Sequence, residues 1–453
     1  MKIVIVGDGK VGVTLTEQLS KEGHDIVIID KDLKVLKESV DQYDVMGVHG
    51  SGTSLSAQRE AGVGESDLMI SATSADEVNI LCCILARRLG VKRTIARVRD
   101  PEYNDQLVFL KEDLGLSMTI NPEQAAAMEI LNLLRFPAAL KRDTFAKGRV
   151  EIIEIKLTDK SPLCGKYLHE LAHLTKVQVL VCAVERDGEV FIPTGAFRLQ
   201  AGDDIFVTGA SRNLGVLTRR LDLADRKIKN VVLLGGSRIA YYLAAALLEE
   251  GAKVKIIEID PKRADHLAEI LPKATVVNAD GAQPGVMMSE GLAQADALVT
   301  LTDIDEQNII LSLYGQNMGV YKTITKINRM EYGELAQKMG VESTVSPKDL
   351  VCHNIVRYVR ALGNTEEDSG LVALHRIVND QVEALEFAVT EETKNLGAPL
   401  REMKLKPGVL LACITRGGKV IIPNGDDFIQ KGDSVILVTT ADRMYAELNS
   451  IFA

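Results

Sequence analysis

The first 120 residues alternate short aliphatic runs with amphipathic stretches of helical length. Runs that are apolar without alternation are typical of strands covered on both faces. Stretches such as 11–22 and 79–89 predict helices between these runs, and Gly23 and Gly90 are placed to end them. The pattern predicts a doubly wound α/β fold with a parallel sheet. The strands that we predict are 2–6, 25–29, 44–48, 67–72, 93–98 and 116–120.

The pattern changes after residue 121. A helix is expected from Pro122, where Asn121 can act as the cap, and Pro137 then interrupts it. From residue 150 the elements are shorter and include an Asp187-Gly188 hairpin signal, which predicts a small α+β lobe. Its expected elements are a strand at 150–157, a short helix around 163–171, and a strand at 177–185.

The whole arrangement occurs twice. The segment 7–12 returns as 235–240, and Asp30 returns as Glu258 at the same spacing. Units of this length are complete folding units rather than solenoid repeats. We therefore predict four lobes, with the charged segment 222–229 as the join between the halves. They are two Rossmann-like lobes at 1–140 and 229–367, and two small α+β lobes at 141–225 and 368–453.

The strongest chemical motif is Gly7-Asp8-Gly9-Lys10-Val11-Gly12, between a predicted strand and a predicted helix. In this fingerprint the first glycine permits the tight turn and the second lets a pyrophosphate approach the backbone. The third allows the helix to pack on the sheet. Asp30, at the end of the second strand, can bind ribose hydroxyls and disfavour a 2′-phosphate. The motif predicts NAD or NADH, with ATP or ADP as the open alternative.

The second copy departs from this fingerprint. Gly235 is kept, but Ser237 replaces the glycine that gives clearance, and Ala240 replaces the packing glycine. Glu258 still offers an acceptor for a ribose. Two interpretations stay open for this lobe: weak or altered nucleotide binding, and a scaffold without ligand.

Composition and charge exclude several classes of protein. The net charge of −10 and the absence of tryptophan argue against a nucleic-acid binder. Charge or glycine interrupts every apolar run before it could span a bilayer. The segment His169-Glu170-Leu171-Ala172-His173 matches a zinc-protease motif, but neither histidine recurs in the second copy. We therefore predict no metal site.

A zinc hydrolase stays as a rival class because of the His169–His173 motif, and two functions are favoured over it from the residues alone. A dehydrogenase needs an acid or base beside the nicotinamide, and the small lobes offer none that recurs. The cluster Asp76-Glu77-x-Asn79 does recur, as Asp305-Glu306-x-Asn308, and it could contact ligand or cap a helix. We therefore favour a nucleotide sensor without catalytic residues, and an NAD-dependent oxidoreductase is the alternative.

Several motifs together resemble the RCK, or KTN, domains of potassium-channel regulators. The small lobes, with Ile192-Pro193 and the segment 201–203, resemble the C-terminal domain that accompanies them, and the order over the whole chain resembles the TrkA family. The motifs in the first lobe are the fingerprint, Asp30, His49-Gly50-Ser51-Gly52, Ala72-Thr73 with Asp76-Glu77-x-Asn79, and Arg97-Val98-Arg99-Asp100.

The resemblance implies a regulatory subunit of a potassium uptake transporter. Such a subunit is cytoplasmic and peripheral on the inner face of the membrane, and it forms a ring, expected to be tetrameric, beneath a TrkH-type membrane subunit. The resemblance further implies that Asp8 contributes mainly its backbone. The residues that it assigns to the first nucleotide site are Gly7, Gly9, Gly12, Asp30, Ala72, Thr73 and Arg97.

Overall fold

The computed structural model contains two parallel sheets of six strands and two antiparallel sheets of five strands. Within the part of the chain that it describes, no helix is both long and apolar enough to cross a membrane. The described residues are 1–110, 113–135, 142–145, 149–221, 227–341, 343–366, 371–378, 381–440, 445 and 447–452.

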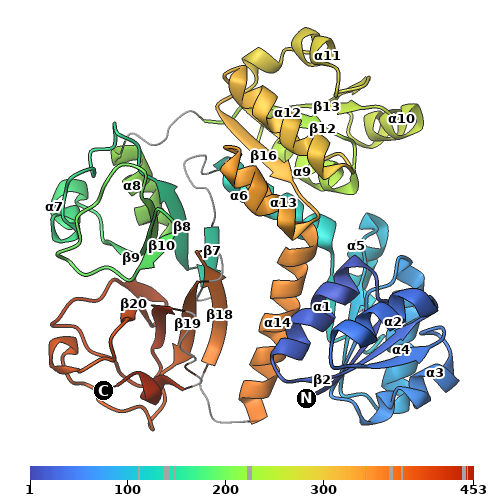
Figure 1. Ribbon diagram of the computed structural model, residues 1–453, viewed down its shortest axis with the longest axis horizontal. Coiled ribbons are helices and arrows are strands. Elements are labelled where there is room, and N and C mark those ends of the chain that lie inside the picture. Colours follow the sequence, from blue (N-terminus) through green and yellow to red (C-terminus); the bar gives the residue numbers. More distant parts are fainter. Residues whose placement is uncertain are drawn as a thin grey trace. The chain divides into compact units, whose positions relative to one another are not determined.

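The first lobe is a parallel sheet in the order β3-β2-β1-β4-β5-β6, the doubly wound order. Chain crossovers that reverse direction between β1 and β4 place helices on both faces, so the central strands β1 and β4 are almost completely buried. The strands are β1 (Lys2–Val6), β2 (Asp25–Asp30), β3 (Met46–His49), β4 (Leu68–Ser71), β5 (Arg93–Arg97) and β6 (Met118–Ile120). The helices, seen in Figure 1, are α1 (Lys10–Lys21), α2 (Leu33–Gln42), α3 (Leu55–Glu60), α4 (Asp76–Leu89), α5 (Pro101–Leu110) and α6 (Pro122–Arg135).

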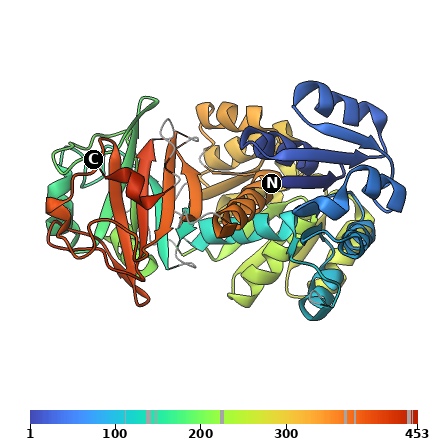
Figure 2. The same cartoon turned by 90° about the horizontal axis from the view of Figure 1, so that it is seen from below.

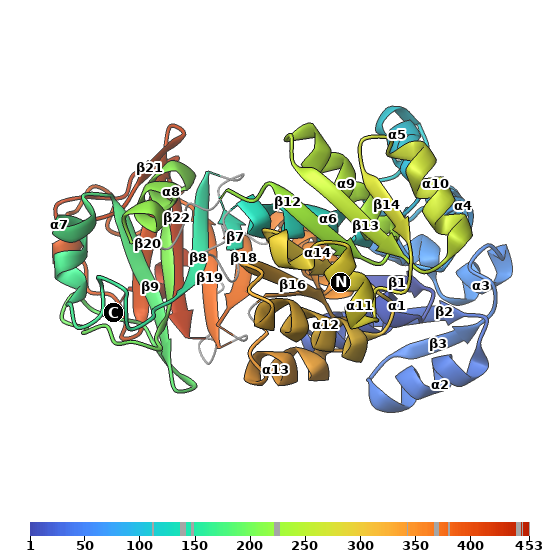
Figure 3. The ribbon, with the colours of Figure 1, turned by 90° about the horizontal axis from the view of Figure 1, so that it is seen from above.

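The second lobe repeats this topology in the order β14-β13-β12-β15-β16-β17 (Figure 3). Its strands are β12 (Asn230–Leu234), β13 (Lys253–Glu258), β14 (Thr275–Asn278), β15 (Ala297–Thr300), β16 (Lys322–Lys326) and β17 (Thr344–Val345). Its helices are α9 (Arg238–Glu249), α10 (Pro261–Ile270), α11 (Pro284–Ser289), α12 (Asp305–Asn317), α13 (Met330–Lys338) and α14 (Pro347–Glu366).

The two small lobes share one antiparallel topology, with sheet orders β10-β9-β11-β8-β7 and β18-β19-β22-β20-β21. The first contains β7 (Arg142–Phe145), β8 (Val150–Lys156), α7 (Leu171–Thr175), β9 (Val179–Arg186), β10 (Glu189–Phe191), β11 (Asp204–Ala210) and α8 (Ser211–Arg220). The second contains β18 (Leu371–Ile377), β19 (Val382–Ala388), β20 (Val409–Arg416), β21 (Lys419–Ile421) and β22 (Ser434–Thr440).

Like lobes pair with like lobes in two compact units. One unit joins Met1–Leu131 to Lys229–Tyr358, and the other joins Asn132–Ile228 to Val359–Ala453. In the second unit, the green strands of the first small lobe face the orange and red strands of the second (Figures 2 and 3). One buried apolar cluster draws on both lobes and includes Phe206, Cys182, Ala412 and Ile436. Sheet-on-sheet packing therefore gives the small lobes a common core.

The predicted fold class is confirmed, and each predicted strand of the first lobe overlaps an observed one. The short helix expected at 163–171 is misplaced. Gly165 adopts a left-handed φ of +78°, and Tyr167 forms a β-bridge with Arg198, so the helical turns begin only at Leu168. Pro137, the domain boundaries at 140–141, 225 and 367–368, and most of the segment 222–229 lie outside the described residues.

Candidate nucleotide-binding site

Three glycines form the turn between β1 and α1. Gly7 has a φ of +92°, and a Cβ on it would lie 3.0 Å from the backbone of Thr73. A Cβ on Gly12 would lie 2.0 Å from the Gly7 carbonyl oxygen, so this position requires glycine. A Cβ on Gly9 would meet nothing within 4 Å, and no side chain caps α1. The N-terminus of α1 is therefore open, with uncapped amides and a positive dipole end that suit a phosphate.

Asp30 fixes the shape of this turn from the end of β2. Its Oδ2 accepts a hydrogen bond from the Asp8 amide at 2.6 Å, and its Oδ1 accepts one from the Asp32 amide at 2.8 Å. Asp8 is 1% exposed, whereas Gly9 and Lys10 are exposed and Val11 is buried in the start of α1. Burial raises the pKa of Asp8, the Ser39 side chain lowers it, and Asp30 raises it further.

Ala72 and Thr73 follow β4, next to β1 in the sheet. The Thr73 amide and hydroxyl both donate to Asn79 Oδ1, at 2.8 and 2.7 Å. Asn79 is completely buried, and its Nδ2 donates to the Arg97 carbonyl at 2.9 Å. The Asn79 side chain thus links Thr73, after β4, to Arg97, at the end of β5, and holds these two candidate site residues in place.

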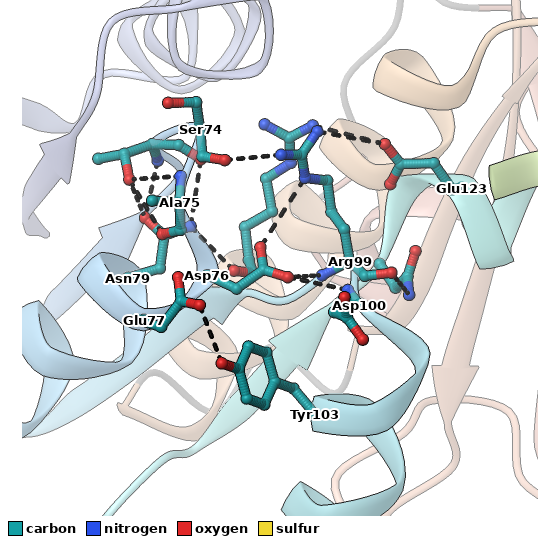
Figure 4. Close-up of polar contacts among 12 residues, drawn as sticks. Ser74, Ala75, Asp76, Glu77, Asn79, Arg99, Asp100, Tyr103 and Glu123 are labelled. Atoms are coloured by element: carbon teal, nitrogen blue, oxygen red, sulfur yellow. Dashed lines mark hydrogen bonds and ion pairs between the residues drawn. The ribbon is translucent and has the colours of Figure 1, made fainter. Parts of the chain in front are cut away.

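Arg97 ends β5 within a cluster of incompletely paired charges, of which Asp76, Arg99 and Glu123 are labelled in Figure 4. Its guanidinium lies 3.8 Å from Glu123, which also lies 3.7 Å from Arg99. Within the described residues, Arg97 Nε, Arg99 Nε and Glu123 Oε2 are buried without a hydrogen-bond partner. Burial lowers the pKa of Arg97, and Glu123 opposes that shift. Because buried charged atoms normally have hydrogen-bond partners, the two unsatisfied guanidinium atoms make this cluster a candidate place for an anion.

The second lobe keeps the turn and closes the helix start. Gly235 has a φ of +98°, and the amide of Gly236 donates to Glu258 Oε2 at 2.5 Å. Glu258 is 3% exposed and also accepts a hydrogen bond from the Asp260 amide, so it makes the same two backbone contacts that Asp30 makes in the first lobe. Ser237 caps α9 by accepting from the Ala240 amide at 3.4 Å. The Ser237 hydroxyl therefore accepts a hydrogen bond from a first-turn amide, whereas no side chain accepts from the first-turn amides of α1.

The recurring cluster of Asp76 and Asn79, repeated as Asp305 and Asn308, makes equivalent hydrogen bonds in both lobes. Asp76 Oδ2 accepts the amides of Arg99 and Asp100, each at 2.8 Å. In the second lobe, Asp305 accepts the amides of Asn328 and Arg329, and Asn308 repeats the role of Asn79. The sequence left ligand contact and helix capping open, but the structure shows a third role, in which these side chains fasten the loop that follows the neighbouring strand.

The residues of the zinc-like motif are engaged in local contacts. Glu170 accepts the Tyr167 amide at 2.8 Å, which caps the helical turn. The His169 ring contacts the Gly195 carbonyl oxygen through Nδ1 at 2.8 Å and stacks on Tyr167. In the described part of the chain, no group of three or more His, Cys, Asp or Glu side chains is placed to hold a metal ion.

The candidate residues of the first lobe gather at the carboxyl ends of adjacent strands β2, β1, β4 and β5. Those of the second lobe (Gly235, Ser237 and Glu258) lie at the ends of β12 and β13 on a separate sheet. Sequence reasoning missed Glu123 and Tyr242 as parts of the surroundings of the first site. For Asn79, the recurrence of the same amide as Asn308 beside Arg97 and Lys326 could have identified its fastening role.

This fold and site define a tandem Rossmann-type protein, with a nucleotide-type glycine turn in the first lobe and paired small lobes. The family model described as the TrkA-N domain matches residues 3–122 and 231–347, and the TrkA-C domain matches 152–222 and 384–452. The chain belongs to the TrkA family, as the motifs in its sequence predicted.

The chain aligns over nearly its full length with proteins named for potassium uptake. The chain is 31% identical to "Trk system potassium uptake protein TrkA homolog 1" of Methanosarcina mazei, over 97% of this chain and 98% of the relative. It is 29% identical to "Trk system potassium uptake protein TrkA" of Haemophilus influenzae, over 100% of this chain and 98% of that protein.

Solved structures support the same fold. The GsuK RCK domain aligns with a TM-score of 0.63 at 18% identity, covering 97% of this chain and 92% of that one. The GsuK channel bound to NAD aligns with a TM-score of 0.62 at 18% identity, covering 97% of this chain and 77% of that one.

Proposed function

We propose that this protein is the cytoplasmic regulatory subunit of a potassium uptake transporter and that NAD or NADH binding to its first lobe controls the transporter. The observation that carries the proposal is the open start of α1 at Gly9, with Asp30 at the neighbouring strand end. Membership of the TrkA family supports the link to potassium uptake, and the NAD-bound relative of the same fold supports the choice of ligand.

The proposed ligand lies with its diphosphate against Gly9 and the first amides of α1. Its adenosine ribose replaces one of the backbone contacts of Asp30, and Arg97 meets a phosphate in place of Glu123. ATP and ADP share the adenosine and the leading phosphates, so they compete for the same site. This role requires binding alone, and no residue is assigned to catalysis.

The proposed partner is a TrkH-type potassium-translocating membrane subunit, beneath which copies of this chain assemble as a tetrameric ring on the inner face of the membrane. Nucleotide binding would favour one arrangement of the ring because a ligand shifts populations by its differential affinity for two states. Copurification with the membrane subunit, followed by potassium flux measured with and without NADH, tests this part directly. A flux that NADH leaves unchanged would contradict control by the nucleotide.

Asp30→Asn tests the nucleotide site. The amide keeps an acceptor for one backbone contact but removes the charge that repels a 2′-phosphate. We expect calorimetry to show weaker NADH binding by about 10- to 150-fold, the range for a hydrogen bond to a charged group, and a smaller preference for NADH over NADPH.

Glu258→Gln is the matched control, because Glu258 holds the corresponding turn in the second lobe. It should leave the affinity of the first site unchanged. Equal affinity for NADH in the wild type and in Asp30→Asn would refute the assignment of Asp30 to the ribose.

A further inference from the structure

A tyrosine of the second Rossmann-like lobe forms hydrogen bonds with residues of the first. Tyr242 lies on α9, the helix that begins at the second glycine turn. Its hydroxyl donates to the Arg99 carbonyl at 3.1 Å and accepts from Asn121 Nδ2 at 3.0 Å. Asn121 Nδ2 also donates to the Arg99 carbonyl at 3.3 Å, so the three groups form a closed set of contacts.

Both partners of Tyr242 belong to the surroundings of the first site, and Figure 4 shows the contacts of one of them, Arg99. Arg99 lies two residues beyond Arg97, and Asp76 fastens its amide, while its guanidinium donates to the Ser74 carbonyl at 2.6 Å. The loops that follow β4 and β5 are thereby tied together at the point where Tyr242 attaches.

Asn121 connects the same point to α6. Its Oδ1 accepts the Gln124 amide at 2.9 Å, which caps the helix, and Glu123 in the first turn faces both Arg97 and Arg99. A change in the ion pairing of Arg97 would therefore affect Glu123 and the first turn of α6. This turn lies next to Asn121, to which Tyr242 is hydrogen-bonded.

In the described part of the chain, the corresponding residue of α1 makes no such contact to the second lobe, although Cys352 Sγ of α14 contacts the Val11 carbonyl at 3.8 Å. Thr14 occupies the position of α1 that corresponds to Tyr242, by the spacing of the two fingerprints. It is buried, and its hydroxyl donates to the Lys10 carbonyl of its own helix at 2.9 Å. The side chain of Thr14 is too short to repeat the tyrosine contact, so the hydroxyl contact to a site loop is made by α9 and not by α1.

Burial helps to keep this hydroxyl protonated. It raises the pKa of Tyr242 to about 12, although the hydrogen bond with Asn121 lowers it. The donor to the Arg99 carbonyl is therefore present throughout the physiological range of pH.

We propose that Tyr242 is a positioning residue that couples nucleotide occupancy of the first site to the second lobe through Arg99 and Asn121. The proposal rests on the nucleotide-binding function proposed above. It predicts that α9 responds to NADH bound at the first site and that this response needs the Tyr242 hydroxyl.

Hydrogen–deuterium exchange on the full chain, with and without NADH, tests the coupling. In the wild type we expect NADH to slow exchange both in the 97–100 loop and in α9, the latter by about 5-fold or more, as for a typical coupling between sites. In Tyr242→Phe the loop should still be protected while α9 stops responding. Calorimetry should show NADH affinity reduced by about 2- to 12-fold, the range for one neutral hydrogen bond.

Tyr241→Phe is the matched control, because it removes a hydroxyl from the adjacent residue, whose ring contacts that of Tyr242. It should behave as the wild type does, and thermal melting should show that both variants are folded. A wild type that binds no NADH would overturn both proposals. A wild type that binds NADH without a response in α9, or a response that survives in Tyr242→Phe, would overturn the coupling alone.

Discussion

At the scale of single residues, Asp8 is an acidic side chain buried in the first glycine turn, and within the described residues its carboxylate oxygens have no hydrogen-bond partner. The second position of the fingerprint needs no side chain, and the second lobe has Gly236 there. Asp8 nevertheless buries its carboxyl group beside Asp30, with Ser39 of α2 as a polar neighbour. Burying an ionised carboxylate without a cation costs free energy, so the turn is less stable when Asp8 is charged.

Asp8→Asn should therefore change the dependence of stability on pH. A raised pKa in the folded state means that the folded chain holds the proton more tightly than the unfolded chain. The stability of the wild type should fall as pH rises from the ordinary aspartate range, near 3.8, to the raised pKa. In Asp8→Asn that decrease should be smaller.

Urea unfolding at a series of pH values measures this difference. The groups that face this region on β2, α2 and α1 are Asp30, Ser39, Tyr43, Glu17 and Lys21, and they stay unchanged in the variant. A difference in unfolding free energy between the two chains that does not vary with pH would contradict the prediction.

At the scale of elements, the two helix starts differ by one serine, which caps the second helix start and has no counterpart at the first. Gly9 precedes α1 without a side-chain cap, and Ser237 precedes α9 and caps it. Serine is a preferred N-cap because its hydroxyl satisfies one of the free amides of the first turn. The same hydroxyl competes with a phosphate for that amide, so the two lobes use the same element differently.

Gly9→Ser should give the first lobe the properties of the second. Open space surrounds Gly9, so the fold should tolerate the change. NADH binding should weaken by about 10- to 150-fold, because the hydroxyl takes an amide that would otherwise bind a charged phosphate. Calorimetry measures the affinity, and thermal melting checks the fold.

Ser237→Gly is the reciprocal control. It should leave NADH affinity at the first site unchanged and cost only a few tenths of a kcal/mol in stability, as glycine is an acceptable N-cap. Unchanged NADH affinity in Gly9→Ser would show that the first amides of α1 do not bind the ligand.

At the scale of the whole molecule, the repeat is arranged so that lobes of one kind support each other. The small lobes bury one apolar cluster between their sheets, and strand β11 contacts β20 across it. Neither small sheet of five strands covers that face by itself. The two halves of the chain therefore depend on each other for stability.

Phe206→Ala tests this dependence. Phe206 is 2% exposed on β11 and belongs to the shared cluster, so its truncation should cost about 3 to 5 kcal/mol. Hydrogen exchange should then become faster in β20 and β22 of the second small lobe as well as in β11.

Leu217→Ala provides a comparison, because Leu217 is equally buried but belongs to the separate core of the first small lobe. It should loosen the first small lobe more than the second. If Phe206→Ala left exchange in β20 and β22 unchanged, the small lobes would be independent folding units.

Most of the helices and strands could be predicted because they depend on short stretches of sequence. Uninterrupted apolar runs predicted the strands of the first lobe, and the recurrence of the fingerprint predicted the second copy of the fold. The helix expected at 163–171 was wrong because the left-handed Gly165 and the bridge of Tyr167 to Arg198 override local helical preference. The bridging partner lies 31 residues further along the chain, beyond any local window.

The sequence by itself determined the kinds of lobe, their order and the glycine turn at Gly7, because each depends on neighbours within a few residues. Only the tertiary structure decided that like lobes pair and that Asn79 fastens two loops. It alone brought Tyr242 against Asn121, across 121 residues of chain. Contacts of that kind depend on which surfaces meet when the lobes pack, and no periodicity along the chain specifies them.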